Sequence, residues 1–176
     1  MQQVIVQKFG GTSVGSGERI AAVAEIIKKE AEINNVVIVV SAMAGETDRL
    51  IELSKQFGDN QNKREFDALI STGEKVSASL LAMALNSLGL KAKSYSAAQV
   101  SLKTTSNFSK AMILDIDKAK MEEILTDDSI PIITGFQGIT ETGEVTTLGR
   151  GGSDTTAVAI AAYIKADRCY IYTDVD

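Results

Sequence analysis

The stretch that decides the fold is VVIVV at Val36–Val40, five consecutive β-branched residues. A strand with one face in water alternates apolar and polar residues, whereas a strand of a parallel sheet is covered on both faces and is apolar throughout. Val36–Val40 therefore predicts a central strand of a parallel sheet. The exit loop Ser41–Gly45 is then expected at the carboxyl end of the sheet, where α/β proteins bind their ligands.

Strands and helices alternate on both sides of this segment. Upstream, Val4–Val6 predicts a strand, and apolar residues at helical spacing between Glu18 and Ile33 predict an amphipathic helix. Downstream, further helices are expected at 47–57, 63–87, 118–125 and 154–165, further strands at 90–95, 112–116, 130–134 and 169–172, and a hairpin within 135–143. This alternation predicts an α/β three-layer sandwich around a largely parallel central sheet.

The composition limits the class of protein. The 176 residues, 44% hydrophobic and 23% charged, are enough for one domain with one core. The net charge is −5 and the charges are dispersed, so we expect no nucleic-acid partner. No apolar run reaches the roughly 20 residues that span a bilayer, and no leader pattern precedes Val4, so we expect a cytoplasmic protein without a membrane partner.

Two residue types restrict the chemistry. The chain contains no histidine, which excludes Ser-His-Asp triads, histidine-based zinc sites and imidazole general bases. Catalysis is left to Lys, Arg, Asp, Glu and hydroxyl groups. The single cysteine, Cys169, lies in an apolar run and cannot form an intrachain disulfide, so we interpret it as a core residue in a reducing compartment.

The first candidate motif is KFGGTS at Lys8–Ser13, where a predicted strand leads a lysine into a glycine loop. Glycines let backbone N–H groups approach an anion closely, so the spacing is equally compatible with a phosphate site and with an ordinary turn. The P-loop pattern GxxxxGK[ST] is absent, and Gly15-x-Gly17 lacks the third glycine of a dinucleotide-binding fingerprint.

The second candidate motif is LGRGGSDTT at Leu148–Thr156, an arginine in a glycine loop at the start of an apolar helix. A helix N-terminus beside an arginine suits a carboxylate or a phosphate. The alternative is that Asp154 only caps the helix and that Arg150 is a solvated loop residue.

Three weaker candidates lie between and beyond these motifs. Glu74, flanked by small residues in a helical region, is placed to hold an ammonium group or is a surface glutamate. Ser41 and Thr47 follow the central strand and carry hydroxyls suited to a carboxylate, although Thr47 is equally suited to cap a helix. Thr173 and Asp174 follow the last strand and either face a nucleotide or fray.

Together, six blocks resemble aspartate kinases of the amino-acid kinase fold. The blocks are Lys8–Ser13, Val39–Met43, Ser71–Glu74, Ile133–Phe136, Thr147–Asp154 and Tyr172–Asp176. Their order and rough spacing match over essentially the whole chain. The resemblance implies an amino-acid kinase-like fold and transfer of the ATP γ-phosphoryl group to the β-carboxylate of L-aspartate, giving 4-phospho-L-aspartate, the first step towards lysine, threonine and methionine.

The resemblance also implies a role for each candidate residue. Lys8 would contact the transferring phosphoryl group, and Asp154 would organise Lys8. Substrate-binding roles are implied for Ser41, Thr47, Glu74, Arg150, Gly151, Gly152 and Ser153, with Arg150 on the α-carboxylate and Glu74 on the α-ammonium group. Nucleotide-binding roles are implied for Lys8, Phe9, Gly10, Gly11, Thr173 and Asp174. Mg²⁺ would arrive with ATP, so no dedicated protein metal site is expected.

The resemblance sets expectations for the extent of the protein too. Aspartate kinases continue past the last block, so residues 1–176 are expected to form a catalytic domain truncated at its C-terminal end, with regulatory domains absent. A homo-oligomer is expected. Two alternatives stay open: a catalytically silent module that binds an amino acid or a nucleotide, and a same-fold kinase for glutamate, acetylglutamate, carbamate or a nucleoside monophosphate.

Overall fold

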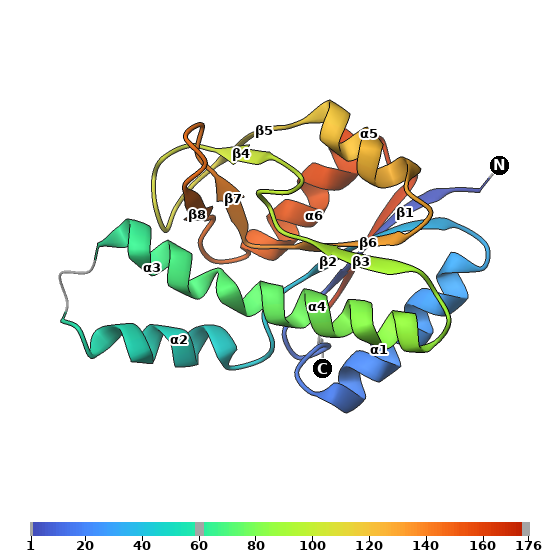
Figure 1. Ribbon diagram of the computed structural model, residues 1–176, viewed down its shortest axis with the longest axis horizontal. Coiled ribbons are helices and arrows are strands. Elements are labelled where there is room, and N and C mark those ends of the chain that lie inside the picture. The colour runs from blue at the N-terminus through green and yellow to red at the C-terminus, as the bar shows by residue number, and fades with distance from the viewer. Residues whose placement is uncertain (1, 59–61, 174–176) are drawn as a thin grey trace.

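Five parallel strands form the central sheet of the computed structural model, which describes residues 2–58 and 62–173 (Figure 1). The strands are β1 (Val4–Phe9), β2 (Asn35–Val40), β3 (Ala92–Tyr95), β6 (Ile130–Thr134) and β9 (Arg168–Tyr172), in the order β3–β6–β2–β1–β9. Every pairing between neighbours is parallel. β2 occupies the centre, and Val36–Val40 is buried throughout, which confirms the prediction from its sequence.

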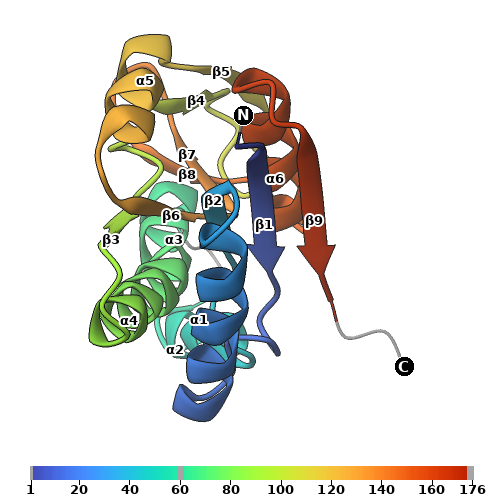
Figure 2. The ribbon, with the colours of Figure 1, turned by 90° about the vertical axis from the view of Figure 1, so that its right-hand side faces the viewer.

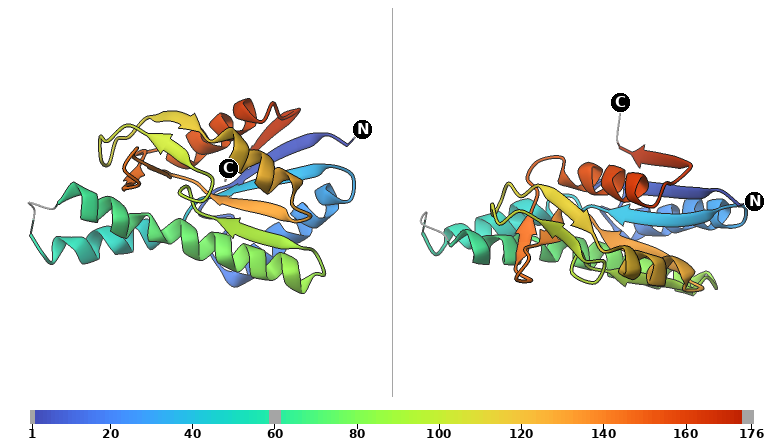
Figure 3. Two further views of the ribbon diagram at one scale, coloured as in Figure 1. Left: turned by 45° about the horizontal axis from the view of Figure 1, so that its top comes forward. Right: turned by 90° about the horizontal axis from the view of Figure 1, so that it is seen from above.

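Helices cover both faces of this sheet. α1 (Gly17–Ala31) and α4 (Thr72–Ser87) pack on one face, and α5 (Lys118–Thr126) and α6 (Gly152–Tyr163) lie on the other, as Figures 2 and 3 show. Because successive side chains of a strand point to opposite faces, Ile38 of β2 joins the core under α1 and α4 whereas Val39 joins the core under α5 and α6. The predicted three-layer α/β sandwich is confirmed.

A smaller sheet and a helical hairpin lie beside this sandwich. The smaller sheet has the order β5–β4–β7–β8, from β4 (Leu102–Thr104), β5 (Ile113–Ile116), β7 (Gln137–Ile139) and β8 (Val145–Thr147). α2 (Glu46–Lys55) and α3 (Lys63–Ile70) pack side by side (Figure 1). These additions matter for function because β8 leads into the loop of Arg150 and α3 leads into the helix of Glu74.

Several predicted boundaries were wrong. The hairpin expected within 135–143 is formed by β7 and β8 and therefore extends to Thr147. The helix expected from Asp154 begins two residues earlier, at Gly152. The helical region 63–87 divides at Ser71 into α3 and α4. β4 was not predicted, because three residues are too few to show a strand periodicity.

The run from Lys63 to Ser87 is long and apolar enough to cross a membrane by length and composition alone. Half of the apolar 18-residue part of this run is buried inside the protein. Core helices of soluble proteins can be equally long and apolar. Ala78, Leu81 and Leu85 of this run pack in the core against the central sheet. The burial of these side chains explains the apolar composition without a membrane.

Candidate active site

A cavity of about 320 Å³ opens at the carboxyl ends of the central strands. Its lining residues are Lys8, Ser41, Ala42, Thr47, Glu74, Phe136, Gly149, Arg150, Gly151, Gly152, Ser153 and Asp154. The cavity thus brings together every residue that was predicted to be catalytic or to bind the substrate. These residues come from strand ends and helix starts, the usual position of ligand sites in open α/β sheets.

Lys8 and Asp154 form an ion pair in this cavity. Lys8 Nζ lies 2.6 Å from Asp154 Oδ1, with 8% of the lysine side chain and 45% of the aspartate side chain exposed. Asp154 is not a helix cap, because α6 starts at Gly152 and its N-cap is Gly151, so the capping alternative is wrong. The carboxylate instead lies in the first turn of α6, where the helix dipole stabilises negative charge, and holds the nearly buried lysine in place.

Glu74 contributes a buried carboxyl group to the cavity. It is 2% exposed, in the first turn of α4, and the surface alternative is therefore wrong. Its Oε1 accepts a hydrogen bond from Ala42 N at 3.2 Å, and its Oε2 is buried without a partner among the described residues. Burial raises the pKa of Glu74 to about 7. A buried carboxylate oxygen that lacks a donor and lines a cavity suits a cationic ligand such as an ammonium group.

Arg150 supplies the opposite charge. It is exposed and lies between Gly149 and Gly151, both of which have positive φ (84° and 73°). Among the described residues, no carboxylate forms an ion pair with Arg150. Its guanidinium group is therefore available for a carboxylate or phosphate, which it can bind with two parallel hydrogen bonds.

Hydroxyl groups line the rest of the cavity. Ser41 follows β2 directly, and its backbone is fixed because its carbonyl accepts a hydrogen bond from Ser77 Oγ at 2.6 Å. Thr47 lies within α2, whose N-cap is Gly45, so the alternative that Thr47 caps this helix is wrong. Ser153 is 8% exposed and packs against Gly135, where an added Cβ would lie 2.8 Å from Ser153 Oγ.

The predicted glycine loop lies beside the lysine. A Cβ added to Gly10 would lie 3.5 Å from Lys8 Nζ, and one added to Gly11 would lie 2.8 Å from the carbonyl oxygen of Ala42. Only glycine fits at Gly11 without displacing backbone. Gly10 borders Lys8 and Gly11 borders Ala42, but neither glycine is among the residues that line the cavity.

Phe9 and Thr173, which also have implied nucleotide-binding roles, do not line this cavity. The ring of Phe9 is 1% exposed and stacks on Tyr172, with 4.6 Å between ring centroids. The Phe9 side chain therefore belongs to the core and does not reach the cavity. Thr173 is exposed just past β9, next to the end of β1. Asp174 lies outside the described residues.

Phe136 is a cavity residue that was not predicted. It has a φ of 71°, which is unusual for a residue with a bulky side chain. Its N–H donates to Thr156 Oγ1 at 3.1 Å, and that hydroxyl donates to Gly152 O at 2.9 Å. These bonds hold Phe136 against the start of α6. Its position two residues after β6, at the carboxyl end of the sheet, was the signal that could have identified it.

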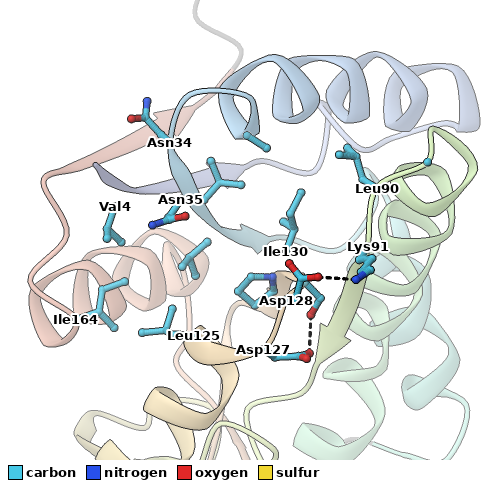
Figure 4. Close-up of a pocket in the computed structure, with 16 residues that line it drawn as sticks. Val4, Asn34, Asn35, Leu90, Lys91, Leu125, Asp127, Asp128, Ile130 and Ile164 are labelled. Carbon is cyan, nitrogen blue, oxygen red and sulfur yellow. Dashed lines mark hydrogen bonds and ion pairs between the residues drawn. The ribbon is translucent and has the colours of Figure 1, made fainter. Parts of the chain in front are cut away.

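A second cavity, of about 510 Å³, lies at the opposite end of the strands (Figure 4). Its charged side chains are already paired: Lys91 with Asp128, and Asp127 with Lys93. Asp127 also accepts a hydrogen bond from Ser129 Oγ at 2.7 Å. The candidate site is therefore the smaller cavity, where neither Glu74 nor Arg150 has an ion-pair partner among the described residues. Among residues 2–58 and 62–173, no three acidic or cysteine side chains are grouped to hold a metal ion.

Comparisons with known proteins agree with this architecture. An aspartate kinase of Pseudomonas putida is 55% identical over 174 residues, covering 98% of this chain and 42% of the relative. The crystal structure of aspartate kinase from Synechocystis superposes with a TM-score of 0.86 at 47% identity, covering 98% of this chain and 28% of that chain. The crystal structure of E. coli aspartokinase III in complex with aspartate and ADP superposes with a TM-score of 0.83 at 27% identity, covering 98% of this chain and 49% of that chain. The chain thus spans less than half the length of each of these proteins. Residues 3–176 match the model of the amino acid kinase family. The chain therefore belongs to the amino acid kinase family.

Proposed function

We propose that this chain forms the aspartate-binding and phosphoryl-transfer part of an ATP-dependent aspartate kinase. The observation that carries the proposal is a pair of complementary groups in one cavity: among the described residues, Glu74 has a buried oxygen without a hydrogen-bond partner and Arg150 has no ion-pair partner. An α-amino acid presents the two complementary charges. The names of the relatives, aspartate kinase and aspartokinase, support aspartate as that amino acid.

The proposed substrate orientation follows from the charges. Glu74 would accept hydrogen bonds from the α-ammonium group, and Arg150 would hold the α-carboxylate. Ser41, Thr47 and Ser153 would donate hydrogen bonds to the remaining oxygens, together with backbone N–H groups of Gly151 and Gly152. The β-carboxylate would then face the Lys8–Asp154 pair, which determines which carboxylate reacts.

Lys8 would act on the phosphoryl group. Its ammonium would neutralise charge on the oxygens of the γ-phosphoryl group during transfer, and Asp154 would hold it in position. Gly10 and the backbone of Phe9 lie beside Lys8, and Gly11 continues the same loop, so the nucleotide phosphates would lie along this loop. Thr173 would lie towards the nucleotide. Mg²⁺ would be held mainly by phosphate oxygens and water.

The reaction needs no general base. An aspartate β-carboxylate is ionised at neutral pH and attacks the γ-phosphorus directly; the new O–P bond forms while the bond to the ADP oxygen breaks, and no proton moves. Positioning and positive charge are the contributions required of the protein. This requirement fits a chain without histidine. A cytoplasmic location is proposed with this function, because ATP and free aspartate are cytoplasmic substrates.

Calorimetric titration with L-aspartate tests the proposal, with L-glutamate and N-acetylglutamate as controls and circular dichroism as the check of folding. We expect heat from L-aspartate that exceeds that from both controls. A folded chain that does not distinguish aspartate from the controls would overturn the proposed substrate. Trapping of an acyl phosphate by hydroxylamine, with ADP formation, then separates a kinase from a module that only binds aspartate.

A further inference from the structure

Asp67 of α3 is a fully buried carboxylate outside the candidate active site. It is 0% exposed and does not line the cavity of Lys8 and Glu74. Its two oxygens accept four hydrogen bonds: Oδ2 from Ser109 N at 2.8 Å and Thr147 N at 2.7 Å, and Oδ1 from Ser109 Oγ at 2.9 Å and Thr147 Oγ1 at 3.0 Å. Four donors and no acceptor suit an ionised carboxylate, which only accepts.

These bonds join three segments that are distant in the sequence. Asp67 belongs to α3, Ser109 to the loop between β4 and β5, and Thr147 to the end of β8. Ala111 N also donates to Thr147 O at 3.0 Å, so the loop and β8 are connected directly. Ser109 has a φ of 68°, a conformation that persists where surrounding bonds determine it. Asp67 supplies two of those bonds.

The segment that Asp67 fixes carries Arg150. Thr147 is the last residue of β8, and the loop from Gly149 to Gly151 starts two residues later. A Cβ on Gly149 would lie 3.3 Å from the Ser109 carbonyl oxygen, so this loop packs directly on the second residue that Asp67 holds. Any shift of Ser109 or Thr147 would therefore be passed to Arg150.

The helix that carries Asp67 continues to Glu74. α3 and α4 follow each other through Ser71, which has helical dihedral angles (φ −68°, ψ −11°). Asp67 and Glu74 are seven residues apart, about two helical turns, and so lie on the same side of the run. One end of this helical run therefore holds the loop of Arg150, and the next part of it holds Glu74 in the cavity.

We infer that Asp67 is a positioning residue that sets the spacing between Glu74 and Arg150. The inference rests on the proposed function, in which these two side chains bind the ammonium and the carboxylate of one amino acid. Asp67 touches neither substrate nor reacting atoms. Its effect is exerted through Thr147 and Ser109 on the Arg150 loop.

The arrangement of donors makes the inference testable with a conservative variant. One oxygen of Asp67 faces two backbone N–H groups, and the other faces two hydroxyls, which can reverse and accept. In Asp67→Asn, the amide oxygen can accept both N–H groups while the NH₂ group donates to both hydroxyls. The amide therefore keeps all four bonds without the charge, whereas Asp67→Ala loses all four.

The experiment measures Kd by calorimetry for L-aspartate, β-alanine and succinate, the last two by competition. β-Alanine lacks the α-carboxylate that Arg150 would hold, so its binding should not depend on the position of the Arg150 loop, whereas succinate lacks only the ammonium group and should still depend on it. For Asp67→Ala, we expect the Kd of aspartate to rise about tenfold or more, the Kd of succinate to rise as well, and the Kd of β-alanine to change less than about threefold. For Asp67→Asn, we expect all three within about threefold of the wild type.

A matched pair covers the case in which Asp67→Ala does not fold. Ser109→Ala removes one of the four bonds, and Ser106→Ala removes an exposed hydroxyl from the same loop. Only Ser109→Ala should weaken aspartate binding, by about two- to fivefold. Equal effects of the two variants would overturn the inference. The inference would also be overturned if Asp67→Asn weakened aspartate binding as much as Asp67→Ala does. The charge of Asp67, and not its hydrogen bonds, would then determine the binding.

Hydrogen exchange separates this inference from the proposed function. In the absence of ligand, amides of residues 147–152 should exchange faster in Asp67→Ala and at the wild-type rate in Asp67→Asn. If the wild-type chain binds no aspartate, the proposed function fails, and the exchange rates still show whether Asp67 holds the loop. Unchanged exchange in Asp67→Ala would overturn the role of Asp67 whatever the ligand.

Discussion

Lys8 and Asp154 form an ion pair of 2.6 Å in which the cation is almost completely buried and the anion is half exposed. Lys8 ends up in the cavity because it alternates along β1 with Gln7 and Phe9, whose side chains face the opposite side of the sheet. Asp154 reaches it from the first turn of α6. A strand end and a helix start, distant in sequence, thus place an ammonium group and its counter-charge side by side in the cavity.

The first prediction concerns this lysine. Lys8→Ala should lower kcat of the aspartate kinase reaction by about 10²- to 10³-fold, because it removes a charge that stabilises the transferring phosphoryl group. The KM for aspartate should change little, since Glu74 and Arg150 hold the other end of the substrate. Steady-state kinetics of ADP formation measure both constants. Lys75→Ala, which removes an exposed lysine next to Glu74, is the control, and an equal loss of kcat in both variants would contradict the role of Lys8.

The second prediction follows from the pKa of Glu74, which burial raises from 4.5 to about 7. Between these two pH values the folded state keeps a proton that the unfolded state loses. Stability contributed by Glu74 is therefore complete below about pH 4.5 and is lost as the pH rises to about 7, by about 3 kcal/mol. Glu74→Gln lacks this loss and can still accept the hydrogen bond from Ala42.

Urea unfolding of the wild type and of Glu74→Gln at pH 4.5 and 7.5 measures the effect. The free energy of unfolding of Glu74→Gln relative to that of the wild type should increase with pH. The variant should also bind aspartate more weakly than the wild type does, because the ammonium group of the ligand loses its carboxylate partner. Glu65→Gln, a change at an exposed glutamate of α3, should show neither change. A relative stability of Glu74→Gln that is constant with pH would contradict the raised pKa.

Sequence reasoning identified the central sheet and most of the cavity because both depend on local signals. Continuous β-branched residues define β2, and glycine runs mark where backbone must come close to other groups. The burial of Phe9 was also predictable: if Lys8 faces the cavity, its neighbour on β1 must face the opposite core. The resemblance implies a nucleotide-binding role for Phe9, and this alternation leaves its backbone, not its side chain, beside Lys8.

Other features depend on contacts that no local pattern reveals. Asp67 is bonded to residues 42 and 80 positions further along the chain. In the sequence it is one acid among several on a helix, and its burial follows only from how β8 and the Ser109 loop pack on α3. Phe136, between β6 and β7, likewise has a positive φ and donates a hydrogen bond to Thr156 of α6, a contact that the sequence of β6 does not specify.

The third prediction concerns the shape of the arginine. Arg150→Lys should weaken aspartate binding by about tenfold, because an ammonium group cannot form the two parallel bonds of a guanidinium with a carboxylate. Binding of β-alanine, which lacks the α-carboxylate, should not change, and neither should Tm, because Arg150 is exposed. Competition calorimetry and thermal unfolding measure these effects. An equal loss for both ligands would mean that Arg150 does not contact the α-carboxylate.

The fourth prediction concerns the contact between the two loops that flank Lys8. In Gly11→Ala, the new Cβ would lie 2.8 Å from the carbonyl oxygen of Ala42, a backbone atom that cannot rotate away. The Ala42 N–H binds Glu74, so displacement of this loop should disturb the ammonium site as well as the lysine side. We expect a loss of about 1–3 kcal/mol in the free energy of unfolding, together with weaker aspartate binding.

Gly17→Ala is the matched control, because a Cβ there meets no atom within 4 Å and alanine favours the first turn of α1. That variant should be as stable as the wild type or more stable. If Gly11→Ala and Gly17→Ala were equally stable and bound aspartate equally well, the two loops would not be in the close contact on which this geometry depends.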